Sequence, residues 1–183
     1  LTTPELASAM VGRMATYTLL PLSVSEFIGK GGTFVKRCFA KDFKNIKKDK
    51  DISLLDAIKC ASYPELAPIK GNKAKEWLNS YTKKITVEDP KYIYNLTKAE
   101  YMPSLLQSLA ARAGSLINDA SLGREIGLNA VTTRNYRAIL NHTFVTYMLR
   151  PWYKNVTKRL VKARKVYFYD TRLLCHLLEE DLD

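Results

Sequence analysis

Cysteine and histidine are scarce in this chain of 183 residues. It has three cysteines and two histidines, and no two cysteines have the C-x-x-C spacing. Neither a zinc site nor a disulfide framework is indicated, so we expect reduced thiols in a cytoplasmic protein. His142 and His176 are isolated, and no nucleophile is placed for either to activate, so the sequence indicates no hydrolase site.

Long apolar runs and targeting segments are also missing. No stretch approaches the roughly 20 apolar residues that a membrane-spanning helix needs. No basic and then apolar signal peptide opens the chain. We therefore expect no membrane partner. The sequence begins at Leu1 rather than at methionine, so we expect it to be part of a longer protein.

The phosphate-binding pattern G-x-x-x-x-G-K-[ST] does not occur. The Gly-Lys-Gly-Gly-Thr run at 29–33 lacks the required first glycine and the Lys-Ser/Thr ending, which favours a flexible turn. The acids near the C-terminus lack the later acid and lysine of a nuclease site, so we expect a capping Asp170 and a solvated acidic tail. We expect this chain alone to be catalytically inactive and to hold no cofactor or metal. These acids are Asp170, Glu179, Glu180, Asp181 and Asp183.

Acidic residues are outnumbered by basic ones. The 29 Lys and Arg exceed the 18 Asp and Glu and give a net charge of +11. Such a surplus favours polyanionic partners, nucleic acid above all. A solvated basic face that meets an acidic partner is the alternative. Six of the cations lie between 154 and 165, where the sequence has no acid.

The hydrophobic pattern is mostly helical, with a change of period after residue 141. A short strand is expected over 14–20, with Ser23 and Glu26 forming a capping box that opens the next helix. Asn118 and Asn129 are expected to cap two later helices. Helical spacing predicts inward faces made of Leu105, Leu106, Leu109, Ala113, Thr133, Tyr136, Ile139 and Leu140. Proline residues, including Pro90, are expected to separate the later helical pieces. Helices are expected at 4–10, 23–27, 34–46, 51–62, 72–86, 91–100, 101–113, 118–127, 129–141 and 170–178, and strands at 143–149 and 166–169.

Three helices followed by a two-stranded hairpin is the order of a winged helix. The sequence thus predicts a mainly α fold, in which a helical connector precedes a winged helix-turn-helix with a two-stranded wing. The second helix of the pair would present Thr132, Arg134 and Arg137 to the major groove, because Arg can read guanine and Thr and Arg can hold phosphates. The phosphate contacts expected from the wing are Lys154, Lys158, Arg159, Lys162 and Lys165.

Several segments resemble the C-terminal part of prokaryotic AAA-superfamily ATPases, which carry a domain of unknown function built from a winged helix and a restriction-endonuclease-like fold. They are Leu-Ala-Ala-Arg-Ala-Gly at 109–114, Leu-Arg-Pro-Trp-Tyr-Lys-Asn at 149–155 and Lys-Val-Tyr-Phe-Tyr-Asp at 165–170. Gly12 and Arg13, followed by Leu-Pro-Leu-Ser at 20–23, are similar to that family's last core strand. Arg137, Arg164 and Arg172 depart from the pattern and make this chain more basic.

The resemblance implies a layout and partners. Residues 1–28 would end the ATPase core, 29–97 would form the connector, 98–170 the winged helix, and 171–183 the start of a nuclease-like domain. ATP and Mg would belong to the full-length parent, with Arg13 sensing nucleotide. The expected function is a regulatory, DNA-contacting part of that ATPase, which would bind double-stranded DNA.

Two other functions stay open. The basic surface could make the chain an interaction module that docks on its own ATPase core, its nuclease-like domain or an acidic partner. A transcription regulator in its own right is also conceivable, but the core-like strand near the N-terminus argues against it.

Overall fold

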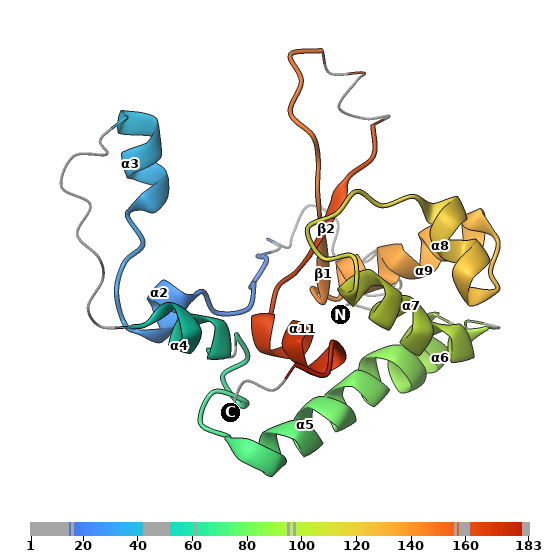
Figure 1. The fold of residues 1–183 in the computed structure, drawn as a ribbon, viewed down its shortest axis with the longest axis horizontal. Helices are drawn as coiled ribbons and strands as arrows, with labels where there is room; N and C mark the ends of the chain where they lie inside the picture. Colours follow the sequence, from blue (N-terminus) through green and yellow to red (C-terminus); the bar gives the residue numbers. More distant parts are fainter. Residues whose placement is uncertain are drawn as a thin grey trace.

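The described part of the chain is mainly helical, with one small antiparallel sheet (Figure 1). The computed structural model describes residues 15, 17–41, 52–60, 62–94, 96, 98–155, 157 and 162–180. Its helices are α2 (Val24–Phe27), α3 (Phe34–Ala40), α4 (Leu54–Lys59), α5 (Gly71–Lys83), α6 (Asp89–Tyr94), α7 (Met102–Ala110), α8 (Asp119–Ile126), α9 (Ala130–His142) and α11 (Thr171–Leu177). The strands are β1 (Thr146–Leu149) and β2 (Lys165–Phe168).

The long helix at the bottom of Figure 1 corrects the expectation that Pro90 separates two helices. A π-helical turn, η1 (Lys84–Glu88), joins α5 directly to α6, and Pro90 lies at the second position of α6. Proline has no N–H, and its ring collides with the carbonyl four residues earlier in a regular α-helix. The wider turn, in which the Asp89 N–H donates to the Lys84 carbonyl, relieves that collision and lets the helix continue.

Helices α7, α8 and α9 surround the main hydrophobic core. Leu105, Leu106 and Leu109 of α7 are fully buried, as their spacing predicted. On α9 the predicted inward face is confirmed, because Tyr136 and Leu140 are buried with their neighbours Thr133 and Ile139. The core also takes Leu66, Ala74 and Leu78 from the preceding segment and Val145, Val166 and Leu173 from the following one.

The two strands form a hairpin in the register Thr146 to Phe168 through Leu149 to Lys165. The first strand begins three residues later than predicted, because Thr143 still bonds to α9 and Phe144 adopts a left-handed conformation with φ 57°. A third short segment pairs with β2. The Gly114 N–H donates to the Val166 carbonyl, and the Ile117 N–H to the Arg164 carbonyl, on either side of a bridge between Leu116 and Lys165.

Helix α11 begins at the predicted cap and ties the C-terminal region to the connector. The buried Asp170 carboxylate accepts from the N–H groups of Leu173 and Ser62. The Arg172 guanidinium donates to the Ile69 carbonyl at 2.8 Å. These bonds hold residues 62–69 against the start of α11. Burial raises the pKa of Asp170, and the hydrogen bonds that its carboxylate accepts oppose that rise.

The N-terminal region differs most from the sequence-based expectations. Residues 17–20 form no strand, and Tyr17 and Leu19 are exposed. A strand forms only when its backbone finds a neighbour, and none of the described segments pairs with this one. The capping box of Ser23 and Glu26 is confirmed. The helix expected at 4–10 lies outside the described residues.

Helix α3 forms where the sequence predicted a helix, but its apolar side chains are not buried. The recurrence of apolar residues at three- and four-residue steps predicted an amphipathic helix here, yet Phe34 is 76% and Phe39 87% exposed. In Figure 1, α3 stands apart from the other helices. The periodicity therefore predicted this helix correctly, but it did not indicate whether another described segment packs against it.

Candidate nucleic-acid interface

Helices α8 and α9 are tightly packed and joined by a short turn. The Asn118 and Asn129 side chains cap the two helices by accepting backbone N–H groups, and Gly127 ends α8 with φ 80°. Gly123 lies where the unit is most crowded. A Cβ atom there would lie 2.5 Å from the Leu128 carbonyl oxygen and 2.6 Å from the Thr133 hydroxyl oxygen. A glycine is therefore needed for α8 to approach the turn and α9 this closely.

The predicted groove residues lie on α9, but their surroundings differ. The Arg134 side chain is 70% exposed and only loosely paired, at 3.4 Å from Asp119. The Arg137 side chain is 14% exposed, and its Nε and Nη2 donate to the two Asp119 oxygens at 2.7 and 2.9 Å. Thr132 is half-buried near the start of the helix, where its N–H is bonded to the Asn129 side chain. Of the two arginines, only Arg134 presents most of its side chain to solvent.

Asp119 is the acid that organises these arginines. Burial alone would raise the pKa of Asp119, but the hydrogen bonds and charges of Arg137 and Arg134 outweigh burial and hold it below its ordinary value of 3.8. The bidentate geometry with Arg137 is the kind that fixes a guanidinium in one orientation. Arg137 thus holds α9 to the start of α8.

Three arginines converge where the hairpin leaves the helices. Burial lowers the pKa of the Arg164 guanidinium, and the like charges of Arg150 and Arg137 lower it further. The register brings Arg150 opposite Arg164, one position beyond the last pair, Leu149 and Lys165. Among the described residues, no carboxylate forms an ion pair with Arg150 or Arg164. Like charges placed opposite each other destabilise a hairpin unless an anion lies between them.

The sequence-based site had left out Arg150 and Arg164. Their signal was the hairpin register, which places residues 150 and 164 opposite each other once the strand ends are known. The remaining predicted phosphate contacts are only partly described. Lys154, Lys162 and Lys165 lie in or beside the loop that joins the strands, and Lys165 begins β2 as an exposed residue. The others, Arg13, Lys158 and Arg159, lie outside the described residues.

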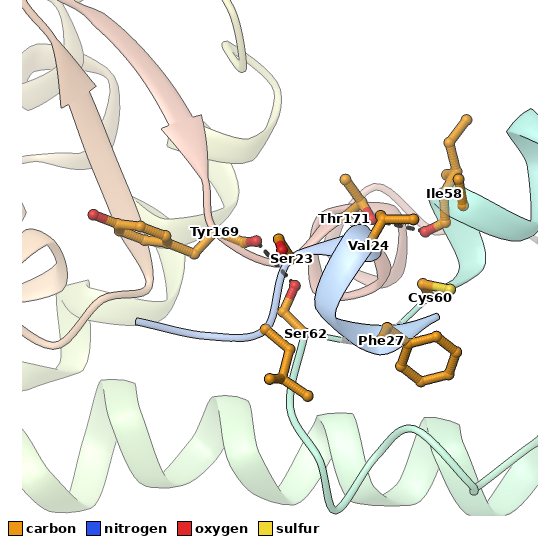
Figure 2. A pocket seen from close by; sticks show the side chains of 10 residues that line it. Ser23, Val24, Phe27, Ile58, Cys60, Ser62, Tyr169 and Thr171 are labelled. Carbon is orange, nitrogen blue, oxygen red and sulfur yellow. Dashed lines mark hydrogen bonds between the residues drawn. The ribbon is translucent and has the colours of Figure 1, made fainter. Parts of the chain in front are cut away.

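A separate apolar cavity of about 290 Å³ lies at the junction of α2, α4 and α11 (Figure 2). Its hydroxyl groups already bond within the chain. The Ser62 hydroxyl donates to the Tyr169 carbonyl, and the Thr171 hydroxyl to the Ile58 carbonyl. Cys60 also lines the cavity, and burial raises the pKa of its thiol. The two bonds therefore hold α4 and the segment after it to the start of α11, and the lining offers little polar chemistry.

No group of three or more His, Cys, Asp or Glu among the described residues is arranged to hold a metal ion. None of the described helices is both long and apolar enough to cross a membrane. The three cysteines are not joined in disulfides.

Residues 53–183, well over half of the chain, match a family described as Domain of unknown function (DUF8612). The chain belongs to this family. The match begins at the cap of α4 and includes α8, α9, the hairpin and α11, so the DUF8612 region contains every described residue of the candidate interface.

Two curated mycobacterial proteins resemble the DUF8612 chain. They are uncharacterized protein Mb2031c of Mycobacterium bovis and uncharacterized protein Rv2008c of Mycobacterium tuberculosis. Each is 28% identical over 118 residues, which cover 64% of this chain and 27% of the relative. The chain thus spans about a quarter of the length of these relatives. No solved structure gives a significant match.

Proposed function

We propose that this DUF8612 chain is a winged helix that contacts double-stranded DNA. The observation that carries the proposal is that Arg150 and Arg164 follow the last hairpin pair, Leu149 and Lys165, without a carboxylate partner among the described residues and close to Arg137 of α9. Helices α7, α8 and α9, the short paired segment at 114–117 and the hairpin follow the order of a winged helix. A cluster of like charges at the root of a basic loop fits a phosphate backbone better than any uncharged partner.

Each residue takes a distinct role in this arrangement. Arg134 and Thr132 face the groove from α9, with Arg134 able to leave its long contact to Asp119. Arg137 acts as a positioning residue, because both Asp119 oxygens hold it. Arg150 and Arg164 join Lys165 as phosphate contacts, with Lys154, Lys158, Arg159 and Lys162 of the same loop.

The larger protein is proposed to be an AAA-superfamily ATPase, with this chain as its regulatory part. The support is the resemblance of the segments at 109–114, 149–155 and 165–170 and the greater length of the mycobacterial relatives. ATP, Mg and the nucleotide-sensing role of Arg13 belong to that parent, which contains the ATPase core and the nuclease-like domain. Docking on the ATPase core or on an acidic protein is the competing function, favoured by the exposed Phe34 and Phe39 of α3.

Fluorescence anisotropy with a labelled random duplex of about 20 base pairs tests the DNA contact. We expect micromolar binding at low salt with a steep log–log salt slope, and a slope smaller by about 1 for each phosphate contact removed. Arg150→Ala and Arg164→Ala should each weaken binding, as should Arg134→Ala. Lys83→Ala, which removes one exposed charge from α5, is the matched control and should leave affinity nearly unchanged.

Two results would reject the proposal. One is the absence of duplex binding at low salt. The other is an equal loss of affinity in Lys83→Ala and Arg164→Ala, because a general charge effect would then explain the binding. An interaction of the basic surface with the purified ATPase core in the absence of DNA would instead support the competing function.

A further inference from the structure

The hairpin has one face in the core and one face outside it. Successive residues of a strand point to opposite faces. Val166 is fully buried, and Met148 and Phe168 pack against the core, so these residues define the inner face. Tyr147 lies opposite Tyr167 on the other face, and neither ring belongs to the core cluster.

Four aromatic rings follow one another along this outer face. Phe144 meets Tyr169 edge-on, with ring centroids 5.9 Å apart. Tyr169 lies 5.8 Å from Tyr147, and Tyr147 stacks on Tyr167 at 5.7 Å with 28° between the ring planes. Tyr147 remains 36% exposed. A row of rings that contact one another outside the core is a surface available for stacking.

The same face carries one positive charge of the hairpin. Lys165 is exposed and lies two positions before Tyr167 in β2, so the two side chains share the outer face. In the connecting loop, Trp152 is 75% exposed. Residues 150–165 contain seven Lys or Arg and no acid. Aromatic rings for bases and cations for phosphates thus lie on one continuous segment of the chain.

We infer that the outer face of the hairpin binds single-stranded nucleic acid. Unpaired bases would stack on Tyr147 and Tyr167, and the phosphates would reach Lys165 on the same face. The rings favour a single strand over a duplex, because the faces of paired bases are covered by their neighbours in the helix. An acidic protein surface would satisfy the cations but would leave the row of rings without a matching partner. This site does not depend on a duplex contact at α9.

The experiment compares labelled oligo-dT of about 20 nucleotides with a duplex of the same length on the whole chain. Loss of one base–ring stack should weaken oligo-dT binding by about tenfold in Tyr147→Ala. Tyr147→Phe keeps the ring and should bind as the unchanged protein does. Arg134→Ala is the matched control, because it should weaken the duplex and spare oligo-dT. Circular dichroism confirms that each variant is folded.

Trp152 gives a second measurement that does not need a variant at Tyr147. Oligo-dT should quench tryptophan emission, and Trp152→Phe should abolish most of that change, since Trp77 lies in a separate cluster with Tyr63 and Tyr81. The inference is overturned if oligo-dT does not bind at low salt, or if Tyr147→Ala binds it unchanged. Binding of the duplex is measured separately, so a failure of the duplex proposal would not affect the conclusion about oligo-dT.

Discussion

Helices α3 and α7 have similar patterns of apolar residues, but those residues are exposed in α3 and buried in α7. Leu105, Leu106 and Leu109 of α7 are fully buried, whereas Phe34 and Phe39 of α3 are largely exposed. The difference is that α7 meets α8, α9 and α11, while α3 follows a glycine-rich turn and packs on none of the described elements to a comparable extent. An amphipathic pattern therefore specifies a face that can be buried, and only a partner decides whether it is.

The largest expected effect contrasts one buried and one exposed apolar side chain. Leu106→Ala should lower the free energy of unfolding by about 2–5 kcal/mol, because it removes packed methyl groups and leaves a cavity. Phe39→Ala should change it by less than about 0.5 kcal/mol. Urea denaturation followed by circular dichroism measures both. Equal losses would show that α3 packs against the core in solution, and the contrast between the two helices would fail.

The glycines of the two regions give a second matched pair. Gly123→Ala should destabilise the fold by about 1–3 kcal/mol, since the added methyl group collides with the Leu128 carbonyl and the Thr133 hydroxyl. Gly31→Ala places its methyl group in open space and should be neutral or slightly stabilising. Thermal unfolding of both variants tests this. A neutral Gly123→Ala would mean that α8 and α9 are not held this closely.

A third contrast concerns two ion pairs within the helical region. Arg137→Ala should cost about 1–3 kcal/mol, because it leaves the partly buried Asp119 without its main partner. Arg112→Ala breaks the more exposed pair with Glu125 and should cost at most about 1 kcal/mol. Denaturant midpoints of the two variants, with Asp119→Ala to complete a double-mutant cycle, make the comparison. A similar cost for both would refute the positioning role of Arg137.

The smallest effect is a pH dependence carried by Asp119. Its pKa is lowered in the folded state, so its ionised form stabilises the fold above 3.8, and that contribution is lost as pH falls towards the folded pKa. The stability difference between the unchanged protein and Asp119→Asn should therefore shrink by about 1 kcal/mol below about pH 4. Urea titrations at several pH values would show this.

Asp170 provides the internal check on that experiment. Its pKa is raised, so its effect has the opposite sign, and stability is lost as pH rises towards the folded pKa. Both proteins contain Asp170, so its effect cancels in the difference. A difference that stays constant from neutral to acidic pH would contradict the arginine pairing of Asp119.

Local features were accessible from the sequence because they depend on a few neighbouring residues. The caps Ser23, Asn118, Asn129 and Asp170 each bond to an N–H two or three positions onward, and all were predicted. The burial of Tyr136 and Leu140 on α9 followed from helical spacing. The strand expected at 14–20 failed because a strand needs a partner that the pattern of one segment cannot supply.

The site was predictable only in outline. The sequence placed a basic helix and a basic hairpin in the right order, and it located Arg134 on an exposed face of α9. The tertiary structure decided that Asp119 holds Arg137, that Arg150 and Arg164 meet beyond the strands, and that Tyr147 and Tyr167 stack outside the core. These contacts join residues that are many positions apart, and their geometry depends on strand register and helix packing. The sequence alone thus determined the helix caps, the hydrophobic periodicity and the charge of this protein. The fold decided which charged side chains and which aromatic rings face one another.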